Sequence, residues 1–355
     1  MNPIRLPPEP RVLVVALRRL GDVLLTTPLI RSVKRAYPDA AIEALVFAGT
    51  EGILSGNPDL ADVVTIPERQ GPGDAFMLLR RLWRRYDLAL TTQTGDRPTF
   101  LAWLAGRQSA GPLDADRLSA SLKRFALSRS YTSDRGQHRI VDLLRMTEQL
   151  GIPACTEVVY PQGSVRTGLL PAQPYAVVHA APKYRYKQWT PDGWRKLVGA
   201  LRQRGMAAAV IGAAADRGYL DDVWRDGGVT RLDGVLSWPE LSALIRGARV
   251  YVGPDTAVTH LAAATGTPVV ALYGPTDPRI WGPWPVGGLD RSWDAAGTIQ
   301  QRGNVWLVQN PLPCLPCQLE GCERRLDSHS QCLDELSVVQ VVAAVDRALA
   351  VRQAA

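Results

Sequence analysis

An aspartate stands where the first glycine turn of the chain opens a helix. The apolar run RVLVVAL (11–17) leads into RRLGDVLLTTP, in which Asp22 follows Gly21. A strand, a glycine turn and a helix start commonly seat a phosphate, because the helix start offers N–H groups and a partial positive charge. A carboxylate there would repel a phosphate. Asp22 is therefore either an ordinary first-turn acid or a group with a chemical task.

A second strand, turn and helix start lies in YVGPDTAVTHLAAATG (251–266). Asp255 or Thr256 can cap this helix, whose first N–H groups could then bind an anion. His260 lies four residues after Thr256, on the same helix face. A capped helix with a packed histidine is the alternative interpretation. The loop GPTDP (274–278) leaves the next strand at the same sheet edge and favours a binding site.

Two further loops of the second half carry charged candidates. Lys187 lies just before a helix start, where a lysine could neutralise a diphosphate. Lys183 and Arg185 are close by, and spacing alone does not choose among the three. Asp216, in the loop GAAADRG, is a candidate for binding ribose hydroxyls, with a surface acid at a helix start as the alternative.

Apolar strand-like runs alternate with amphipathic helical stretches, and this plan restarts after the Pro- and Gly-rich segment 160–174. Continuous apolar strands separated by helices predict parallel sheets covered on both faces. We therefore expect an α/β protein with two doubly wound Rossmann-like domains, facing a central cleft at the carboxyl ends of their strands. The expected segments are a first domain at 1–165, a second at 166–335 and a C-terminal helix at 336–355 that could pack back on the first domain.

The composition is that of a globular protein, with 21% charged and 46% hydrophobic residues among 355. The net charge of +7 is concentrated in residues 1–170, which hold 22 Lys and Arg against 17 Asp and Glu. This excess suggests an anionic partner, although the absence of a nucleic-acid-binding motif argues against DNA or RNA. No apolar stretch resembles a secretory signal or a membrane span, so we expect a cytoplasmic protein.

Four of the five cysteines fall close together near the C-terminus, spaced C-x2-C-x4-C-x9-C. Thiolates at this density can complete a tetrahedral zinc site, and C-x2-C is the usual first half of one. The second half is irregular, and His329 is within reach as a substitute ligand. Reduced thiols that pack the loop, or disulfides formed after purification, are the alternatives. The four are Cys314, Cys317, Cys322 and Cys332.

Three segments together resemble the lipopolysaccharide heptosyltransferases of glycosyltransferase family 9. They are residues 19–46, the K-x-W of Lys187–Trp189 and residues 252–278, with Asp-Thr-x-x-x-His before Tyr-Gly-Pro-Thr-Asp-Pro. The tail CLPCQLEGCERRLDSHSQCL is similar to the subset called heptosyltransferase III. One departure is Ala257, where many relatives have glycine, although both residues are small.

The resemblance implies a GT-B fold and transfer of heptose from ADP-heptose to the lipopolysaccharide inner core, with inversion and without a cofactor. It also answers the question raised by Asp22. The donor diphosphate would belong to the second domain, so the first turn would face the acceptor, and Asp22 matches the family's catalytic aspartate as general base. The donor would be bound by Lys187, Asp255, Thr256, Ala257, His260 and Asp216.

The acceptor implied by the resemblance is the lipid A-core at the inner membrane surface, which carries acidic sugars and phosphates. Arg117, Lys123 and Arg124 of the basic first half could bind these groups. Four arginines of the helical stretch 74–86 could assist, with solvated helix cations as the alternative: Arg80, Arg81, Arg84 and Arg85.

Three other functions fit parts of the sequence. A nicotinamide-dependent oxidoreductase would need G-x-G-x-x-G after the first strand, and ALRRLGDVLL lacks it. A binding or scaffold protein derived from a transferase, and a transferase that uses another nucleotide sugar, remain as alternatives because fold alone does not settle them.

Overall fold

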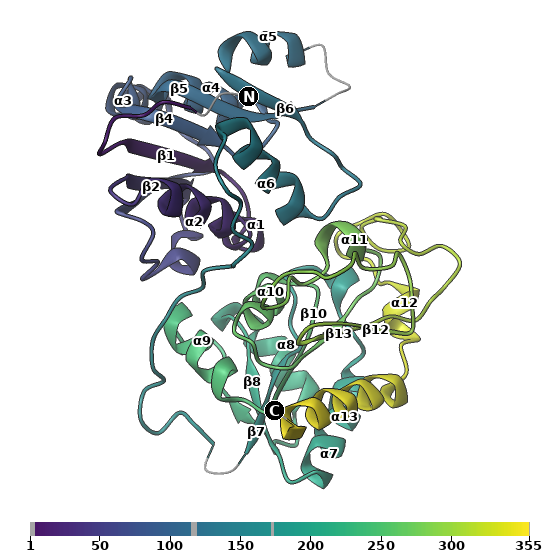
Figure 1. The fold of residues 1–355 in the computed structure, drawn as a ribbon. Coiled ribbons are helices and arrows are strands. Elements are labelled where there is room, and N and C mark those ends of the chain that lie inside the picture. Colours follow the sequence, from purple (N-terminus) through teal and green to yellow (C-terminus); the bar gives the residue numbers. More distant parts are fainter. Residues whose placement is uncertain (1–3, 115–118, 172–173, 355) are drawn as a thin grey trace. The chain divides into compact units, whose positions relative to one another are not determined.

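The computed structural model describes residues 4–114, 119–171 and 174–354. The chain divides into two compact units, Met1–Pro161 and Gln162–Ala355 (Figure 1). The division falls inside the Pro- and Gly-rich segment 160–174.

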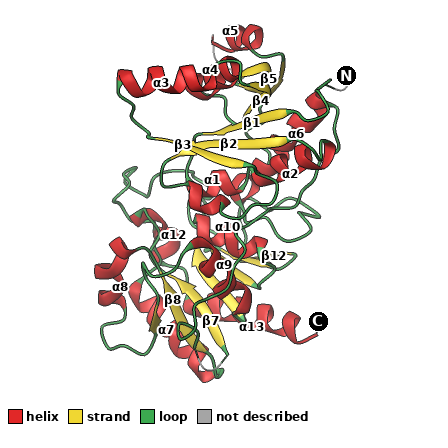
Figure 2. Cartoon of the chain, turned by 90° about the vertical axis from the view of Figure 1, so that its left-hand side faces the viewer, coloured by secondary structure: helices red, strands yellow, loops and turns green. Residues whose placement is uncertain are grey.

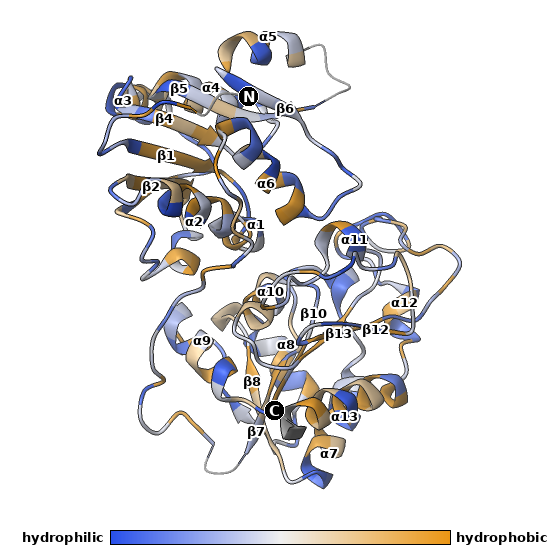
Figure 3. Ribbon diagram, viewed as in Figure 1, coloured by the Kyte–Doolittle hydropathy of each residue, from blue (hydrophilic) through white to orange (hydrophobic). Residues whose placement is uncertain are grey.

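The described part of the first unit is built on one parallel six-stranded sheet in the order β3-β2-β1-β4-β5-β6. Its central strands are mostly apolar, as Figure 3 shows for β1 and β4. Such strands are buried on both faces, which is typical of parallel sheets. The strands are β1 (Arg11–Ala16), β2 (Ala41–Phe47), β3 (Asp62–Ile66), β4 (Tyr86–Thr91), β5 (Gly106–Leu113) and β6 (Arg129–Thr132).

Helices cover both faces of this sheet (Figure 2). Val12 and Val14 of β1 pack with α2 and α6, whereas Leu13 and Val15 pack with α3 and α4, because successive side chains of a strand point to opposite faces. α5 contacts α4 and β5. The helices are α1 (Leu20–Leu24), α2 (Thr27–Ala36), α3 (Pro72–Leu82), α4 (Asp96–Ala105), α5 (Ser119–Ala126) and α6 (Arg139–Leu150), with a 3-10 turn at Glu51–Leu54.

The second unit has a seven-stranded sheet in its described part, in the order β12-β13-β11-β10-β7-β8-β9. Only β12 is antiparallel to its neighbour among these pairs. The strands are β7 (Tyr175–His179), β8 (Ala207–Ile211), β9 (Thr230–Arg231), β10 (Val250–Pro254), β11 (Val269–Leu272), β12 (Ile299–Arg302) and β13 (Val305–Val308).

Two layers of helices flank this second sheet. Val250 and Val252 of β10 share a core with α7, α8 and α13, while the hydroxyl of Tyr251 on the other face is 3.0 Å from that of Thr259 in α10. The helices are α7 (Pro191–Gln203), α8 (Arg217–Val223), α9 (Trp238–Gly247), α10 (Ala257–Ala264), α11 (Pro278–Trp281), α12 (Gln331–Asp334) and α13 (Val338–Ala354), with 3-10 turns at Arg185–Lys187 and Ala214–Asp216.

The C-terminal helix belongs to the core of the second unit. Val341, Ala344, Val345 and Ala348 of α13 are buried there, against α7 and the strands β10, β11 and β13. The sequence suggested packing on the first domain instead. The spacing of these four residues at three or four positions places them on one helix face, which explains why they pack together against the second sheet.

Candidate functional site

Three neighbouring strands of the second unit, β7, β10 and β11, end at one sheet edge. Lys187 follows β7, Asp255 follows β10 directly, and Thr276 follows β11. The carboxyl ends of parallel strands meet at the same edge, and ligands of open α/β sheets bind there. The structure therefore brings the segments singled out by their sequence to one place.

The centre of this edge is an ion pair in which the Lys187 ammonium Nζ donates to Asp255 Oδ2 over 2.5 Å. Asp255 is buried. Burial alone would raise the pKa of this carboxyl, but the charges of Lys187 and His260, with hydrogen bonds from Lys187 and Thr276, bring the pKa below its ordinary value. Asp255 is thus an ionised carboxylate held by cations and a hydroxyl.

The negative charge of Asp255 also affects a buried tyrosine, Tyr273. Burial raises the pKa of Tyr273 well above its ordinary value, and the neighbouring Asp255 carboxylate raises it further. Tyr273 therefore stays a neutral donor, and its hydroxyl also donates to the carbonyl oxygen of Trp281 over 2.7 Å. The carboxylate of the ion pair consequently lies in a buried, hydrogen-bonded setting, where electrostatic interactions are stronger than in water.

The start of α10 lies next to this pair. Thr256 is the N-cap, with an extended backbone, and among the described residues its side chain does not cap the helix. Thr259 Oγ1 donates to the carbonyl of Pro254 and so fixes the turn. Because Ala257 is small and half-buried, an anion can approach the first backbone N–H groups, which carry the positive end of the helix dipole. His260, one turn later, is buried beside Asp255.

The geometry distinguishes among the three cations of the loop after β7. Lys187 is half-buried and contacts Asp255, whereas Lys183 and Arg185 are exposed. The ammonium of Lys183 lies 5.7 Å from the ring centre of Tyr184. Lys187 is therefore the cation that belongs to this edge.

Asp216 is engaged by its own loop. Its Oδ2 accepts a hydrogen bond from the backbone N–H of Ala213 over 2.7 Å, at the start of the turn Ala214–Asp216. This contact fits the alternative interpretation of Asp216 as an acid at a helix start. Binding of ribose hydroxyls by its other oxygen stays a prediction.

In the first unit, Asp22 lies in the first turn of α1, at the carboxyl end of β1. Its Oδ1 is buried and accepts no hydrogen bond from the described residues. Arg139 lies close: burial lowers the pKa of this guanidinium, and the charge of Asp22 is the largest influence that opposes the shift. Asp22 thus has a carboxylate oxygen without a donor, beside a nearly buried cation.

Arg139 is a residue that our sequence interpretation missed. It is the first residue of α6, donates to the carbonyl of Thr92 just after β4, and lies 3.6 Å from Asp142. A cation at a helix start opposes the helix dipole. That unfavourable position in QHRIVDLL was the one local signal that could have marked Arg139 as a residue with a task.

The predicted acceptor residues have different surroundings. Arg117 lies outside the described residues. Lys123 is buried, and its ammonium contacts the carbonyl of Thr94 and Oδ1 of Asp96, each over 2.6 Å, which ties α5 to the start of α4. Arg124 is exposed on α5. Lys123 is therefore built as an internal support, whereas Arg124 is available to a ligand.

The four arginines of the helical stretch 74–86 are exposed, as expected for solvated cations. The guanidinium of Arg84 lies 5.7 Å from the ring centre of Trp103, and that of Arg85 is 4.0 Å from Glu43.

The clustered cysteines are free thiols in the structure, and only Cys332 among the four is buried. Burial and the three neighbouring cysteines raise the pKa of the Cys332 thiol to about 12. Within the described ranges, no group of three or more His, Cys, Asp or Glu side chains is arranged to hold a metal ion. The zinc site predicted for Cys314, Cys317, Cys322 and Cys332 is thus not formed as the side chains stand, and zinc stays a prediction.

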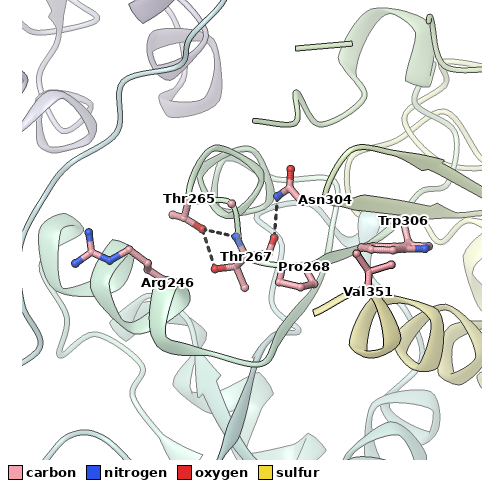
Figure 4. A pocket seen from close by; sticks show the side chains of 8 residues that line it. Arg246, Thr265, Thr267, Pro268, Asn304, Trp306 and Val351 are labelled. Carbon is pink, nitrogen blue, oxygen red and sulfur yellow. Dashed lines mark hydrogen bonds between the residues drawn. The ribbon is translucent and has the colours of Figure 1, made fainter. Parts of the chain in front are cut away.

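A cavity of about 340 Å³ lies at the opposite edge of the second sheet (Figure 4). Its polar side chains bond to one another and to the backbone. Asn304 Nδ2 donates to the carbonyls of Ala263 and Thr267, and the Thr267 hydroxyl donates to Ile245. These groups join the amino ends of the strands, so the cavity reflects the packing of this edge.

The model of the family "Glycosyltransferase family 9 (heptosyltransferase)" matches residues 75–287. Lipopolysaccharide heptosyltransferase 3 of Escherichia coli strain K12 is 31% identical over 293 residues, which cover 76% of this chain and 83% of that protein.

Solved structures show the fold. E. coli ADP-heptose lipopolysaccharide heptosyltransferase II has a TM-score of 0.73 at 17% identity and covers 97% of this chain and 99% of its own. TibC, a dodecameric iron-containing heptosyltransferase crystallised with ADP-D-β-D-heptose, has a TM-score of 0.60 at 14% identity, over 99% of this chain and 78% of its own. The chain has the predicted GT-B fold. Among the described residues, no helix is long and apolar enough to cross a membrane.

Proposed function

Because the chain belongs to glycosyltransferase family 9, the heptosyltransferases, we propose that it transfers heptose from ADP-heptose to the inner core of lipopolysaccharide. The observation that carries this proposal is the pair Lys187–Asp255 beside the start of α10. A half-buried cation next to helix-start N–H groups suits a nucleoside diphosphate, and the names of the relatives supply the sugar and the acceptor.

The donor diphosphate would bind at this edge. An ammonium carries three N–H donors, so Lys187 can bind Asp255 and donate to a phosphate oxygen together. The N–H groups at Thr256–Val258 would bind a second oxygen, because Ala257 leaves the approach open. Asp255, held ionised, would orient Lys187, and His260 would lie beside the phosphates. Asp216 would contact the ribose hydroxyls.

The chemical step would be a single displacement. An acceptor hydroxyl oxygen attacks the anomeric carbon while the bond from that carbon to the β-phosphate oxygen breaks, and ADP leaves with the electron pair. Asp22 takes the proton of the attacking hydroxyl, a role that suits a buried carboxylate oxygen to which no described residue donates. Lys187 and the α10 start would neutralise the charge that develops on ADP. The displacement inverts the anomeric centre and requires no cofactor.

The acceptor would be the lipid A-core at the cytoplasmic face of the inner membrane. Its phosphates would meet the basic first unit, where Arg124 is exposed on α5, with Arg117 near it in the sequence. Lys123 would contribute by holding α5 in place through Asp96 and Thr94. Arg139 would act as a positioning residue for Asp22.

Release of ADP with and without acceptor tests this function. A heptosyltransferase releases ADP from ADP-heptose when a heptose-deficient lipopolysaccharide core is added, and little without it. A scaffold protein that has lost catalysis binds ADP-heptose and releases no ADP under either condition. A transferase for another sugar would release nucleotide from a different nucleotide sugar with the same acceptor.

A further inference from the structure

Large apolar side chains are exposed on three neighbouring helices of the first unit. All four aromatic side chains that are exposed among the described residues lie on α3, on the residue after it, on α4 or on α5. We call this group, with two aliphatic neighbours, the α3–α5 apolar surface; it consists of Phe76, Met77, Trp83, Phe100, Leu122 and Phe125.

These residues share one side of the first unit. α4 contacts both α3 and α5, and the three helices form the layer on one face of the sheet (Figure 2). α4 turns its other faces to the core, so that its outward stripe is Asp96, Phe100 and Trp103, at helical spacing. The rings of Phe100 and Trp103 lie 5.8 Å apart. The exposed apolar side chains therefore lie on three adjoining helices of one layer.

The exposure is large for side chains of this kind. Phe125 is 91% exposed, Leu122 75% and Phe76 65%. A scattered exposed leucine is normal, but a group of aromatic residues on adjoining helices marks an interaction surface. Aromatic and leucine side chains of interfacial helices enter the boundary between lipid headgroups and acyl chains.

Basic residues are interleaved with this surface. Arg80 and Arg81 follow Met77 on α3, Arg84 follows Trp83, and Arg124 lies between Leu122 and Phe125 on α5. Arginines among exposed apolar side chains suit anionic headgroups above the acyl region, because each basic residue near an anionic bilayer is attracted to it. The acidic residues of the three helices are Asp74 and Asp96, of which Asp96 already pairs with Lys123.

We propose that the α3–α5 apolar surface, with Arg80, Arg81 and Arg124, docks the protein on an anionic lipid bilayer. The inference deepens the proposed function and rests on it for its purpose, because a lipid-linked acceptor lies in a membrane. The apolar side chains enter the headgroup region and the arginines bind lipid phosphates. Lys123 holds α5, and with it Leu122 and Phe125, against α4.

Vesicle sedimentation tests this proposal without donor or acceptor, so its outcome does not depend on catalysis. The full chain is mixed with phosphatidylcholine vesicles and with vesicles that also contain phosphatidylglycerol. The test variant is Leu122→Ser with Phe125→Ser, and the matched control is Val286→Ser with Val339→Ser, at sites of the second unit that are 58% and 78% exposed. A second test variant, Arg80→Glu with Arg81→Glu, removes basic charge without changing the apolar side chains.

We expect the full chain to bind the anionic vesicles and to release them as salt rises. The apolar variant should bind the anionic vesicles at least about tenfold more weakly than the original chain. The charge variant should lose its preference for phosphatidylglycerol, whereas the control should bind like the original chain. ADP affinity should be unchanged in all variants.

Three results would overturn the inference. The first is equal vesicle binding by the original chain and the apolar variant, and the second is no vesicle binding by the original chain. The third is a dimer in sedimentation velocity that is absent from the apolar variant, without vesicle binding, since the surface would then pair with a second copy. None of these results would contradict the proposed function, which ADP release with a water-soluble core oligosaccharide measures separately.

Discussion

Lys187 and Asp255, 68 positions apart in the chain, meet in a 2.5 Å ion pair at the carboxyl edge of the second sheet. The carboxylate is buried and the lysine is partly exposed, so the pair presents its positive side to solvent. This polarity is what an anionic ligand requires, because the buried carboxylate is already compensated. We therefore expect the pair to affect both ligand binding and stability, and variants of Lys187 and of Asp255 test these two effects separately.

Replacing Lys187 should weaken ADP binding. A charge-assisted phosphate contact contributes roughly 1.5–3 kcal/mol, so we expect Lys187→Ala to lower the affinity by about 10- to 150-fold in calorimetric titration. The matched control is Lys183→Ala, an exposed lysine of the same loop, which should bind ADP normally. If Lys183→Ala lost affinity for ADP and Lys187→Ala kept it, the phosphate would be bound by Lys183 and our assignment to Lys187 would be wrong.

The same pair should make stability depend on pH at the acid end. The folded pKa of Asp255 is below its ordinary value, so its contribution to the free energy of unfolding is complete above about pH 4 and is lost as the pH falls through the lowered folded pKa. We expect the original chain to lose stability more steeply below about pH 4 than Asp255→Asn. Denaturant unfolding at several pH values measures this.

Asp192 gives the control for that experiment. It pairs with Lys196 over 2.6 Å and its pKa is also lowered, by that hydrogen bond, but the pair is exposed. Because solvent screens exposed pairs, Asp192→Asn should hardly change the acid limb. Parallel acid limbs for the original chain and Asp255→Asn would contradict the expected role of the buried pair.

Asp22→Asn should stop turnover and leave ADP binding intact. The amide keeps the shape of the side chain and cannot take a proton, so the rate should fall by ~10²–10⁴. Asp74→Asn, which changes another first-turn acid of the same unit, should have normal turnover. Near-normal transfer by Asp22→Asn would show that another group, or no group, acts as the base.

Arg124 and Lys123 should respond differently to substitution. Arg124→Glu should raise the acceptor KM several-fold without changing ADP affinity, because the exposed charge would repel an anionic acceptor. Lys123→Ala should lower the unfolding free energy by about 0.5–1.5 kcal/mol, since it removes the bond to the carbonyl of Thr94. An effect of Arg124→Glu on ADP affinity alone would place the acceptor elsewhere.

The clustered cysteines allow a direct test of the predicted metal. Elemental analysis of protein purified under reducing conditions should find zinc in a one-to-one ratio if Cys314, Cys317, Cys322 and Cys332 bind it, and removal should loosen the C-terminal segment before it slows transfer. Iron is measured in the same samples. Fully active protein without bound metal would leave these thiols as packing and disprove the zinc prediction.

Many of the strands were predictable because they are continuous apolar runs, as in β8 and β11. The strand β5, GRQSAGPL, was not predictable, because it has few apolar residues and its glycines instead allow neighbouring atoms to approach closely. A Cβ at Gly106 would lie 2.3 Å from the carbonyl oxygen of Gln108, and one at Gly111 would lie 2.3 Å from Thr91 Cγ2. The backbone near Gly106 and the Thr91 side chain near Gly111 explain these glycines, and the sequence pattern of one strand does not contain such neighbours.

The candidate site divides in the same way. Asp255, Thr256 and His260 follow from one local strand–turn–helix pattern. The choice of Lys187 over Lys183 and the approach of Arg139 to Asp22 depend on which loops the sheet order brings together, which local spacing does not contain.

The measurement that tests the central claim most directly is mass spectrometry of the acceptor. Truncated lipopolysaccharide cores are incubated with ADP-heptose and either the original chain or Asp22→Asn. We predict that the original chain adds the mass of one heptose to a core that lacks it, while Asp22→Asn leaves the core unchanged although it still binds ADP. An unmodified core with the original chain, across the series of truncated acceptors, would contradict the assignment as a heptosyltransferase.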